Sequence, residues 1–460
     1  MAAQSPELIS MSAAELARWI REKKVSSQEA VKGCLARIEK VNPKLNAVVA
    51  LCAERALMEA READALLAKG RPKGPLHGVP MTIKDSFDTA GVVSTGGTLG
   101  RKDFIPARDA TVVARLRQAG AILLGKTNTP EFTFSFSTTN LIYGATKNPY
   151  KLEHEPSGSS GGAAAIVAAA GSPFDIGSDF AGNIRMPAHA CGVAGIKLTS
   201  GRVPRTGHII DYGGALDAFQ QIGPIARRVE DLILILPIIA GPDWVDAAIE
   251  PAPLGDPGRV DLKSLRVAYY TTNGLLDPTP EIQQVVNNCA GLMAAAGAKV
   301  KEAAPPLMKE ASEIFIRLLG ADGGAQLRRR LQKAGTKQTS PTLLLREDAV
   351  KASEFTELVE KLDACRSSLL AFLEDYDVLL CPVSAHPARA LDSQPLPLRV
   401  SYTSLYNITG WPAAVVRAGS SPEGLPLGIQ IVGRPWREDV VLAAAALIES
   451  KTGGWQKPPL

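Results

Sequence analysis

The stretch that most constrains this 460-residue chain runs from Pro156 to Thr199 and is rich in glycine, alanine and serine. It opens with Ser159 and Ser160 among glycines, where backbone N–H groups can approach a bound group because no side chain collides. Residues 163–170 are small and apolar, which predicts a helix packed closely on all sides. A second turn of small residues follows at 179–183. Two such turns that bracket one buried helix can face each other across a site.

Composition and charge describe an ordinary soluble protein. Hydrophobic residues make up 45% of the chain and charged residues 21%, which is typical of a folded globular protein. The net charge of +4 arises from 51 basic and 47 acidic residues, a balance that favours neither nucleic acid nor an anionic membrane as a partner. We therefore expect neither nucleic acid nor a membrane as a partner.

Cysteine and histidine spacing indicates neither a disulfide scaffold nor a metal centre. The six cysteines form no CxxC pair and lie far apart, which predicts free buried thiols. The five histidines show no HExxH or paired spacing, so we expect no metal and no cofactor. His189, which lies near the central stretch, is interpreted as a packing residue. The N-terminus lacks a signal-peptide pattern and no apolar stretch reaches 18 residues, which predicts a cytoplasmic protein.

The first part of the chain predicts a layer of helices over residues 1–70. Ser12 and Ser26 are each followed three residues later by glutamate, the capping-box pattern that starts a helix. A third helix is expected over residues 53–68.

From Gly74 onward, strands and helices alternate. Residues 79–83 alternate in polarity as a strand does and would place Lys84 at the strand end, and Asp109 is the predicted N-cap of a helix that runs to Gln118. A glycine and a buried strand follow, which indicates an α/β arrangement. A second unit of the same kind is predicted from a strand, a helix and a strand at 265–270, 280–296 and 298–301.

Residues Gly120–Thr127 satisfy the G-x-x-x-x-G-K-[ST] pattern of a phosphate-binding loop. In such a loop the four middle residues form a turn and a helix follows. Here they are Ala-Ile-Leu-Leu, which is the predicted strand itself, and Pro130 comes soon after. We therefore do not expect a nucleotide site.

The central stretch resembles the amidase-signature hydrolases, whose core segment reads Gly-Gly-Ser-Ser-Gly-Gly, a helix of small residues, and Asp-Thr-Gly-Gly-Ser-Ile-Arg. The resemblance extends to the Gly-Val-Pro-x-x-Ile-Lys-Asp segment at 78–85 and to a C-terminal segment at 407–439, and so covers most of the chain. It implies an α/β fold with a central mixed, twisted β-sheet covered by helices on both faces. It also implies one domain over 1–460, with a catalytic core at 74–230 and a variable helical region at 300–370.

The resemblance assigns roles to individual residues. It implies that Lys84 is the catalytic base and that Ser159, held by a cis peptide, is the bridging serine. The backbone N–H groups of Phe180, Ala181, Gly182 and Asn183 would form the oxyanion hole. Supporting roles fall to three further residues, Ser160, Asp179 and Arg185.

Asn183 stands where the family carries its nucleophilic serine. It lies 24 positions after Ser159, about the separation the family keeps, so the register is clear. A carboxamide nitrogen is not a nucleophile near neutral pH, and loss of a serine nucleophile costs about 10⁶-fold in rate. We therefore expect the chain to be inactive or nearly so. The retention of Lys84 and Ser159 favours a deliberately substituted enzyme over a decayed homologue.

The resemblance implies hydrolysis of amide C–N bonds, and of carbamates as in urethane-cleaving members, through an acyl-enzyme. One alternative is the amidase component of a tRNA-dependent amidotransferase. A second, kept open by Asn183, is a non-catalytic ligand-binding protein on the same scaffold. The expected partner is a small amide or carbamate, and the protein is expected to be a monomer or homodimer.

Three phenylalanines precede the central stretch and alternate with polar residues, at Phe132, Phe134 and Phe136. This alternation predicts either the core face of a strand or the lining of a substrate channel.

Overall fold

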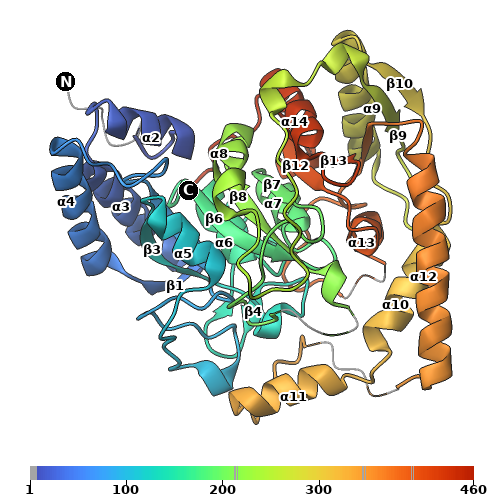
Figure 1. Cartoon of the computed structure of the whole chain (residues 1–460), viewed down its shortest axis with the longest axis horizontal. Coiled ribbons are helices and arrows are strands. Elements are labelled where there is room, and N and C mark those ends of the chain that lie inside the picture. The colour runs from blue at the N-terminus through green and yellow to red at the C-terminus, as the bar shows by residue number, and fades with distance from the viewer. Residues whose placement is uncertain are drawn as a thin grey trace.

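The structure of the protein is a computed structural model that describes residues 8–211, 214, 216–343, 347, 349–394, 396 and 398–460. The first seven residues of the predicted N-terminal layer, and residues 344–346 and 348 of the predicted variable region, lie outside the described residues. Three helices, α2 (Ala13–Arg21), α3 (Ser27–Leu45) and α4 (Ala53–Ala68), lie together on one side of the molecule (Figure 1). Both predicted capping boxes are present, at the starts of α2 and α3.

A small three-stranded sheet adjoins these helices. Its central strand β3 (Ile122–Thr127) runs parallel to β2 (Pro80–Lys84) and antiparallel to β1 (Val48–Leu51). Helix α5 (Thr111–Gln118) precedes β3. Lys84 is the last residue of β2 and is fully buried. The predicted strand is therefore confirmed, and it ends with its lysine inside the protein.

The central sheet has eight strands in the order β10-β9-β11-β13-β12-β7-β8-β6. Strands β9, β10 and β11 are parallel to one another and the remaining neighbours are antiparallel, so the sheet is mixed. The strands are β6 (Phe174–Asp179), β7 (Ala194–Lys197), β8 (Gln221–Ala226), β9 (Arg266–Tyr269), β10 (Lys299–Glu302), β11 (Val378–Pro382), β12 (Ala413–Ser420) and β13 (Pro426–Gly433).

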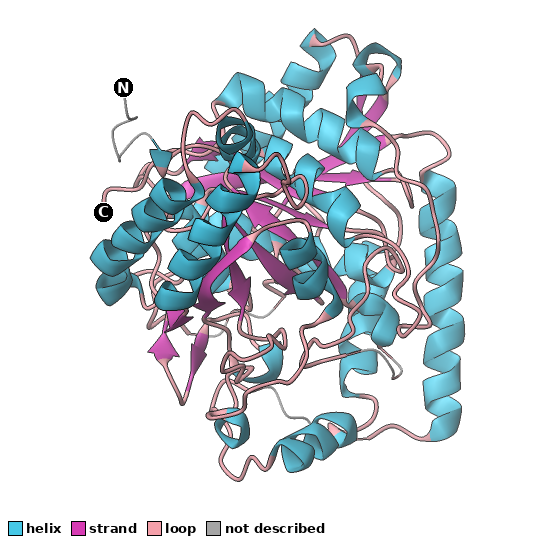
Figure 2. Cartoon of the chain, turned by 60° about the vertical axis from the view of Figure 1, so that its left-hand side comes forward, coloured by secondary structure: helices cyan, strands magenta, loops and turns pink. Residues whose placement is uncertain are grey.

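Helices cover both faces of this sheet (Figure 2). On β12, Val416 packs in the hydrophobic core that contains α8 (Val229–Ile239), α9 (Pro280–Ala295) and α14 (Glu438–Thr452). Its neighbour Val415 packs in the core that contains α6 (Gly161–Ala168). Successive strand residues point to opposite faces, so each face buries its own layer of helices. The predicted fold class, a mixed sheet between two helical layers, is confirmed.

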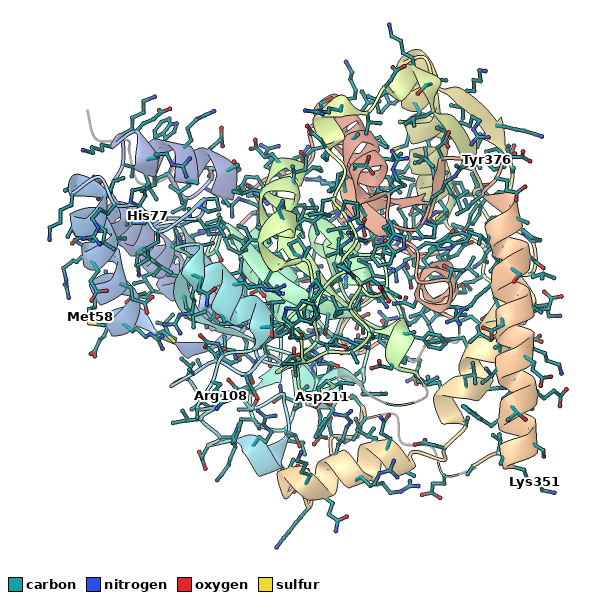
Figure 3. All side chains as sticks on the ribbon, viewed as in Figure 1. Met58, His77, Arg108, Asp211, Lys351 and Tyr376 are labelled. Carbon is teal, nitrogen blue, oxygen red and sulfur yellow. The ribbon has the colours of Figure 1, made fainter. Side chains whose placement is uncertain are left out.

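Three helices pack on strands β9 and β11 at one end of the sheet: α10 (Met308–Gly320), α12 (Ala352–Phe372) and α13 (Ser401–Ile408). Helix α11 (Ala325–Ala334) lies at the bottom of Figure 1, away from this end of the sheet. Lys351 and Tyr376, which flank α12, mark its two ends in Figure 3. Asp211, also labelled there, pairs with Arg330 of α11 at 2.8 Å. This ion pair links α11 to the loop that follows β7.

The remaining elements are short. They are α7 (Arg185–Cys191), the strand pair β4 (Thr139–Asn140) and β5 (Gly144–Ala145), and 3₁₀ turns at Leu99–Arg101, Glu131–Thr133, Asp217–Phe219, Pro257–Arg259 and Leu262–Ser264. All six cysteines are free. In the part of the chain that the structure describes, no helix combines the length and apolar character needed to cross a membrane.

Candidate active site

Lys84 is surrounded by three serine hydroxyls. Its Nζ lies 2.7 Å from Ser159 Oγ and 3.0 Å from the Oγ atoms of both Ser160 and Ser178. Burial lowers the pKa of the amine to about 7, although the carboxylates of Asp175 and Asp179 act in the opposite direction. A large fraction of Lys84 is therefore neutral at neutral pH and able to accept a proton.

Ser159 and Ser160 form the turn that leads into α6. The Gly158–Ser159 peptide bond is cis. A Cβ at Gly158 would lie 2.9 Å from the carbonyl carbon of Phe136, and one at Gly162 would lie 2.5 Å from the nitrogen of Asn128. The glycines are therefore required for close approach of neighbouring backbone. This packing brings Ser159 to Lys84, 75 positions away in the sequence.

The second turn is held by Asp179 at the end of β6. Its carboxylate accepts hydrogen bonds from the backbone N–H groups of Gly182 at 2.8 Å and Ile184 at 3.1 Å. Arg185 donates to both carboxylate oxygens, at 2.9 and 3.0 Å, and neither side chain is exposed. Burial alone would raise the pKa of Asp179, but Arg185 and Asn407 lower it well below its usual range. The carboxylate stays ionised and holds the turn in one conformation.

Asn183 forms hydrogen bonds with residues of both turns. Its backbone oxygen accepts from the N–H of Ser160 at 3.2 Å, and its side-chain Nδ2 donates to the carbonyl of Gly158 at 3.2 Å. The side-chain oxygen Oδ1 accepts from the N–H groups of Phe180 at 3.1 Å and Ala181 at 3.2 Å. The two turns therefore face each other across one site, as the small-residue pattern suggests.

Three of the four N–H groups predicted as an oxyanion hole, those of Phe180, Ala181 and Gly182, differ in their surroundings. Those of Phe180 and Ala181 converge on the Asn183 oxygen, whereas that of Gly182 is already bonded to Asp179. Two converging donors are sufficient to bind a carbonyl oxygen.

A cavity of about 720 Å³ opens beside Asn183. Five phenylalanines contribute to its walls: Phe134, Phe136, Phe180, Phe315 and Phe355. Leucines from α10 and α11 add to the apolar lining, and the charged residues among those that line it are Asp322 and Arg329.

The alternating phenylalanines divide between the two predicted roles. Phe132 is buried in a small hydrophobic cluster, whereas Phe134 and Phe136 line the cavity. The expected strand is absent, because residues 131–133 form a 3₁₀ turn in which Phe132 has a φ of 50°.

Two residues near Lys84 are not predicted from the sequence as part of the site. Ser178 precedes Asp179 on β6, and its Oγ lies 3.0 Å from both Lys84 Nζ and His208 Nε2. Burial, reinforced by the charge of Lys84, lowers the pKa of His208 to about 3, so the imidazole is neutral. Ser178 could have been identified from the sequence, because it directly precedes Asp179. His208 lies in an irregular loop, where no sequence pattern points to it.

Two other residues behave as structural groups. Lys126, the lysine of the phosphate-loop pattern, is buried at 3.0 Å from Thr89 Oγ1 and 2.9 Å from Ser94 Oγ, so it presents no site for phosphate. His189 is buried and accepts from the N–H of Gly428 at 2.9 Å, in agreement with a packing role.

Within the described residues, no group of three or more His, Cys, Asp or Glu side chains is arranged to hold a metal ion.

The chain matches known proteins over nearly its whole length. Residues 29–442 match the family described as Amidase. The chain is 34% identical to a component of the Glutamyl-tRNA(Gln) amidotransferase of Moorella thermoacetica, over 98% of this chain and 99% of that protein. The structure of 6-aminohexanoate cyclic dimer hydrolase superimposes with a TM-score of 0.87 at 29% identity, and that of a peptide amidase with 0.86 at 27% identity, each over 98% of this chain and 99% of the other. The chain therefore belongs to the amidase signature family.

Proposed function

We propose that the site is built to hydrolyse the C–N bond of an amide, with Lys84 as the base, Ser159 as the bridging acid and base, and Asn183 in the position of the nucleophile. The observation that supports this most directly is the 2.7 Å contact between the buried amine of Lys84 and Ser159 Oγ. A buried lysine with a pKa near 7 is suited to accept a proton from a serine.

The proposed reaction requires a hydroxyl at position 183. Neutral Lys84 takes the proton of Ser159, and Ser159 takes the proton of the attacking hydroxyl as it adds to the amide carbon. The N–H groups of Phe180 and Ala181 bind the oxygen that becomes negative. Ser159 then returns a proton to the nitrogen as the C–N bond breaks. Water hydrolyses the acyl-enzyme by the same groups.

Asn183 cannot perform the first step, because its carboxamide nitrogen shares its lone pair with the carbonyl. We therefore propose that the chain as it stands is inactive or nearly so. The Asn183→Ser variant should hydrolyse an aryl amide about 10⁶-fold faster than the unmodified chain.

The test is release of aniline from anilides and N-phenyl carbamates by the two forms. The control is the double variant that combines Asn183→Ser with Lys84→Met. Loss of the gain in the double variant would assign the activity to the proposed relay. If Asn183→Ser gains nothing over the unmodified chain, the proposed hydrolytic site is wrong.

The cavity favours an amide, or a carbamate, with an apolar body. Phenylalanines from four separate segments, represented by Phe134, Phe180, Phe315 and Phe355, surround the space next to Asn183. Burial of apolar ligand surface against such walls contributes about 25 cal/mol per Å².

A second candidate is the role that the relatives carry in their name, a component of a Glu-tRNA(Gln) amidotransferase. The identity to those relatives is 34% over nearly the full chain, which is higher than the 29% identity to 6-aminohexanoate cyclic dimer hydrolase. This difference favours the second candidate over the first. One structural feature also fits: Asp322 and Arg329 line the cavity, and their opposite charges match the ammonium and carboxylate of glutamine. Release of ammonia from glutamine by Asn183→Ser, with no cleavage of anilides, would favour this role over the first.

A further inference from the structure

The side chain of Asn183 is itself an amide that is bound as the proposed substrate would be. Its oxygen accepts from the N–H groups of Phe180 and Ala181, and its nitrogen donates to the carbonyl oxygens of Gly158 at 3.2 Å and Ser135 at 3.4 Å. We propose that the Asn183 carboxamide is an internal ligand that competes with a substrate amide for these two N–H groups. This inference rests on the proposed function, because it takes those groups to be the binding site of the substrate oxygen.

The competition follows from the number of donors. Each backbone N–H has one hydrogen, and those of Phe180 and Ala181 both point at Asn183 Oδ1. The N–H of Gly182, the residue between Ala181 and Asn183, is engaged by Asp179 at 2.8 Å. A second carbonyl oxygen therefore reaches the pair only if the Asn183 side chain leaves it.

The internal ligand holds an advantage over one from solution. Asn183 is attached to the chain and only 4% exposed, so its carboxamide loses no translational entropy when it occupies the site. Leaving the site would break four hydrogen bonds, and the cavity beside it has an apolar lining that offers few replacements.

One consequence concerns ligand binding by the unmodified chain. In the unmodified chain, apolar contact alone supplies the binding free energy of a ligand in the cavity, and the carbonyl group of the ligand contributes none. Replacement of the nucleophile by asparagine thus does more than remove the attacking atom. It also blocks the carbonyl site, which argues against the chain as a tight-binding trap for amides.

The test compares two ligands that differ in one carbonyl group, N-phenylhexanamide and N-hexylaniline, by calorimetry on three forms of the full chain. Asn183→Ala removes the internal oxygen and should bind the amide about tenfold more tightly than the amine, because two hydrogen bonds to the ligand become available. The unmodified chain should bind the two ligands equally. Leu370→Ala, at an exposed side chain on α12 outside the cavity lining, is the control; it keeps the Asn183 carboxamide and should also show no preference.

The inference is wrong if Asn183→Ala shows no preference for the amide, or if the unmodified chain shows the same preference. A second measurement reports on the hydrogen bond itself: in protein labelled with ¹⁵N-phenylalanine, the amide signal of Phe180 should shift further with N-phenylhexanamide than with N-hexylaniline in Asn183→Ala, and by the same amount with both ligands in the unmodified chain. The proposed function is tested separately by turnover of the same anilide in Asn183→Ser. Turnover without a ligand preference in Asn183→Ala overturns only the inference, and a preference without turnover overturns only the hydrolytic function.

Discussion

At the scale of single residues, the site depends on ionisable groups that are buried away from water and that contact specific partners. Lys84 and Asp179 are both fully buried, yet their pKa values move for different reasons. Burial dominates for Lys84 and favours the neutral amine. For Asp179 the adjacent Arg185 outweighs burial and favours the carboxylate. In the proposed mechanism the neutral amine of Lys84 accepts a proton, whereas the carboxylate of Asp179 holds the turn.

The pH dependence of the Asn183→Ser variant tests the state of Lys84. A base works only when it is deprotonated, and burial lowers the pKa of Lys84 to about 7. We expect kcat/KM for an anilide to rise with pH, with a midpoint near 7, and to level off above it. Asp175, whose pKa burial raises to about 6, ionises below that midpoint, and its negative charge acts against the neutral form of Lys84. A rate that is constant from pH 5.5 to 9 would contradict a neutral-lysine base.

At the scale of elements, helix ends are set partly by local sequence and partly by distant contacts. Ser12 and Ser26 cap α2 and α3 as their sequence patterns predict. Asp109 does not cap α5, which begins after Ala110. Its carboxylate instead accepts from the N–H of Ala90 at 2.7 Å and pairs with Arg117. A partner across the fold has displaced the local capping role.

The start of α2 offers an element-scale prediction about stability. The N–H of Ala14 donates to Asp231 of α8 at 2.9 Å, and burial raises the pKa of Asp231 to about 7. The folded protein therefore holds a proton that the unfolded chain releases between about pH 4 and 7. The resulting stabilisation is complete below pH 4 and is lost as the pH rises through 7.

Asp231→Asn keeps an oxygen for Ala14 and cannot ionise, so the fall in Tm between pH 5 and pH 8 should be smaller in this variant than in the parent. Glu302→Gln, at an exposed position on β10, is the control and should follow the parent. An equal fall in all three proteins would show that Asp231 does not titrate in this range.

At the scale of the whole molecule, the cavity lies where two parts of the fold meet. Phe180 comes from the turn after β6, whereas Phe315 comes from α10, within the region predicted to vary. Their ring centroids lie 6.1 Å apart, and the ring of Phe219 lies 6.1 Å from that of Phe180. The turns that carry the proposed chemistry and the helices that shape the substrate space are therefore separate parts of the structure.

This division predicts that α10 controls substrate size rather than the chemical step. In an Asn183→Ser background, Phe315→Ala should raise KM for N-phenylhexanamide about tenfold and leave kcat within about twofold, because it removes apolar lining contributed by α10, whereas the groups proposed for the chemical step belong to other elements. Leu370→Ala, at a side chain 51% exposed on α12, is the control and should leave KM unchanged. A loss in kcat with constant KM would place Phe315 in the chemical step instead.

The sequence alone determined what depends on short patterns. Residues that are neighbours in the chain predict the capping boxes of α2 and α3, the strand that ends at Lys84, the two small-residue turns and the alternation of helices and strands. These features are local because propensity, periodicity and capping act within one element or one turn. The mixed order of the central sheet was expected only from the family resemblance, because strand pairing joins distant segments. The tertiary structure decided what depends on contacts between distant segments. Lys84 meets Ser159 across 75 positions, His208 reaches Ser178 from an irregular loop, and a cavity forms beside the turn after β6. The orientation of the Asn183 carboxamide toward Phe180 and Ala181 belongs to the same class, because the conformation of its turn is held by Asp179 and Arg185 in the buried interior.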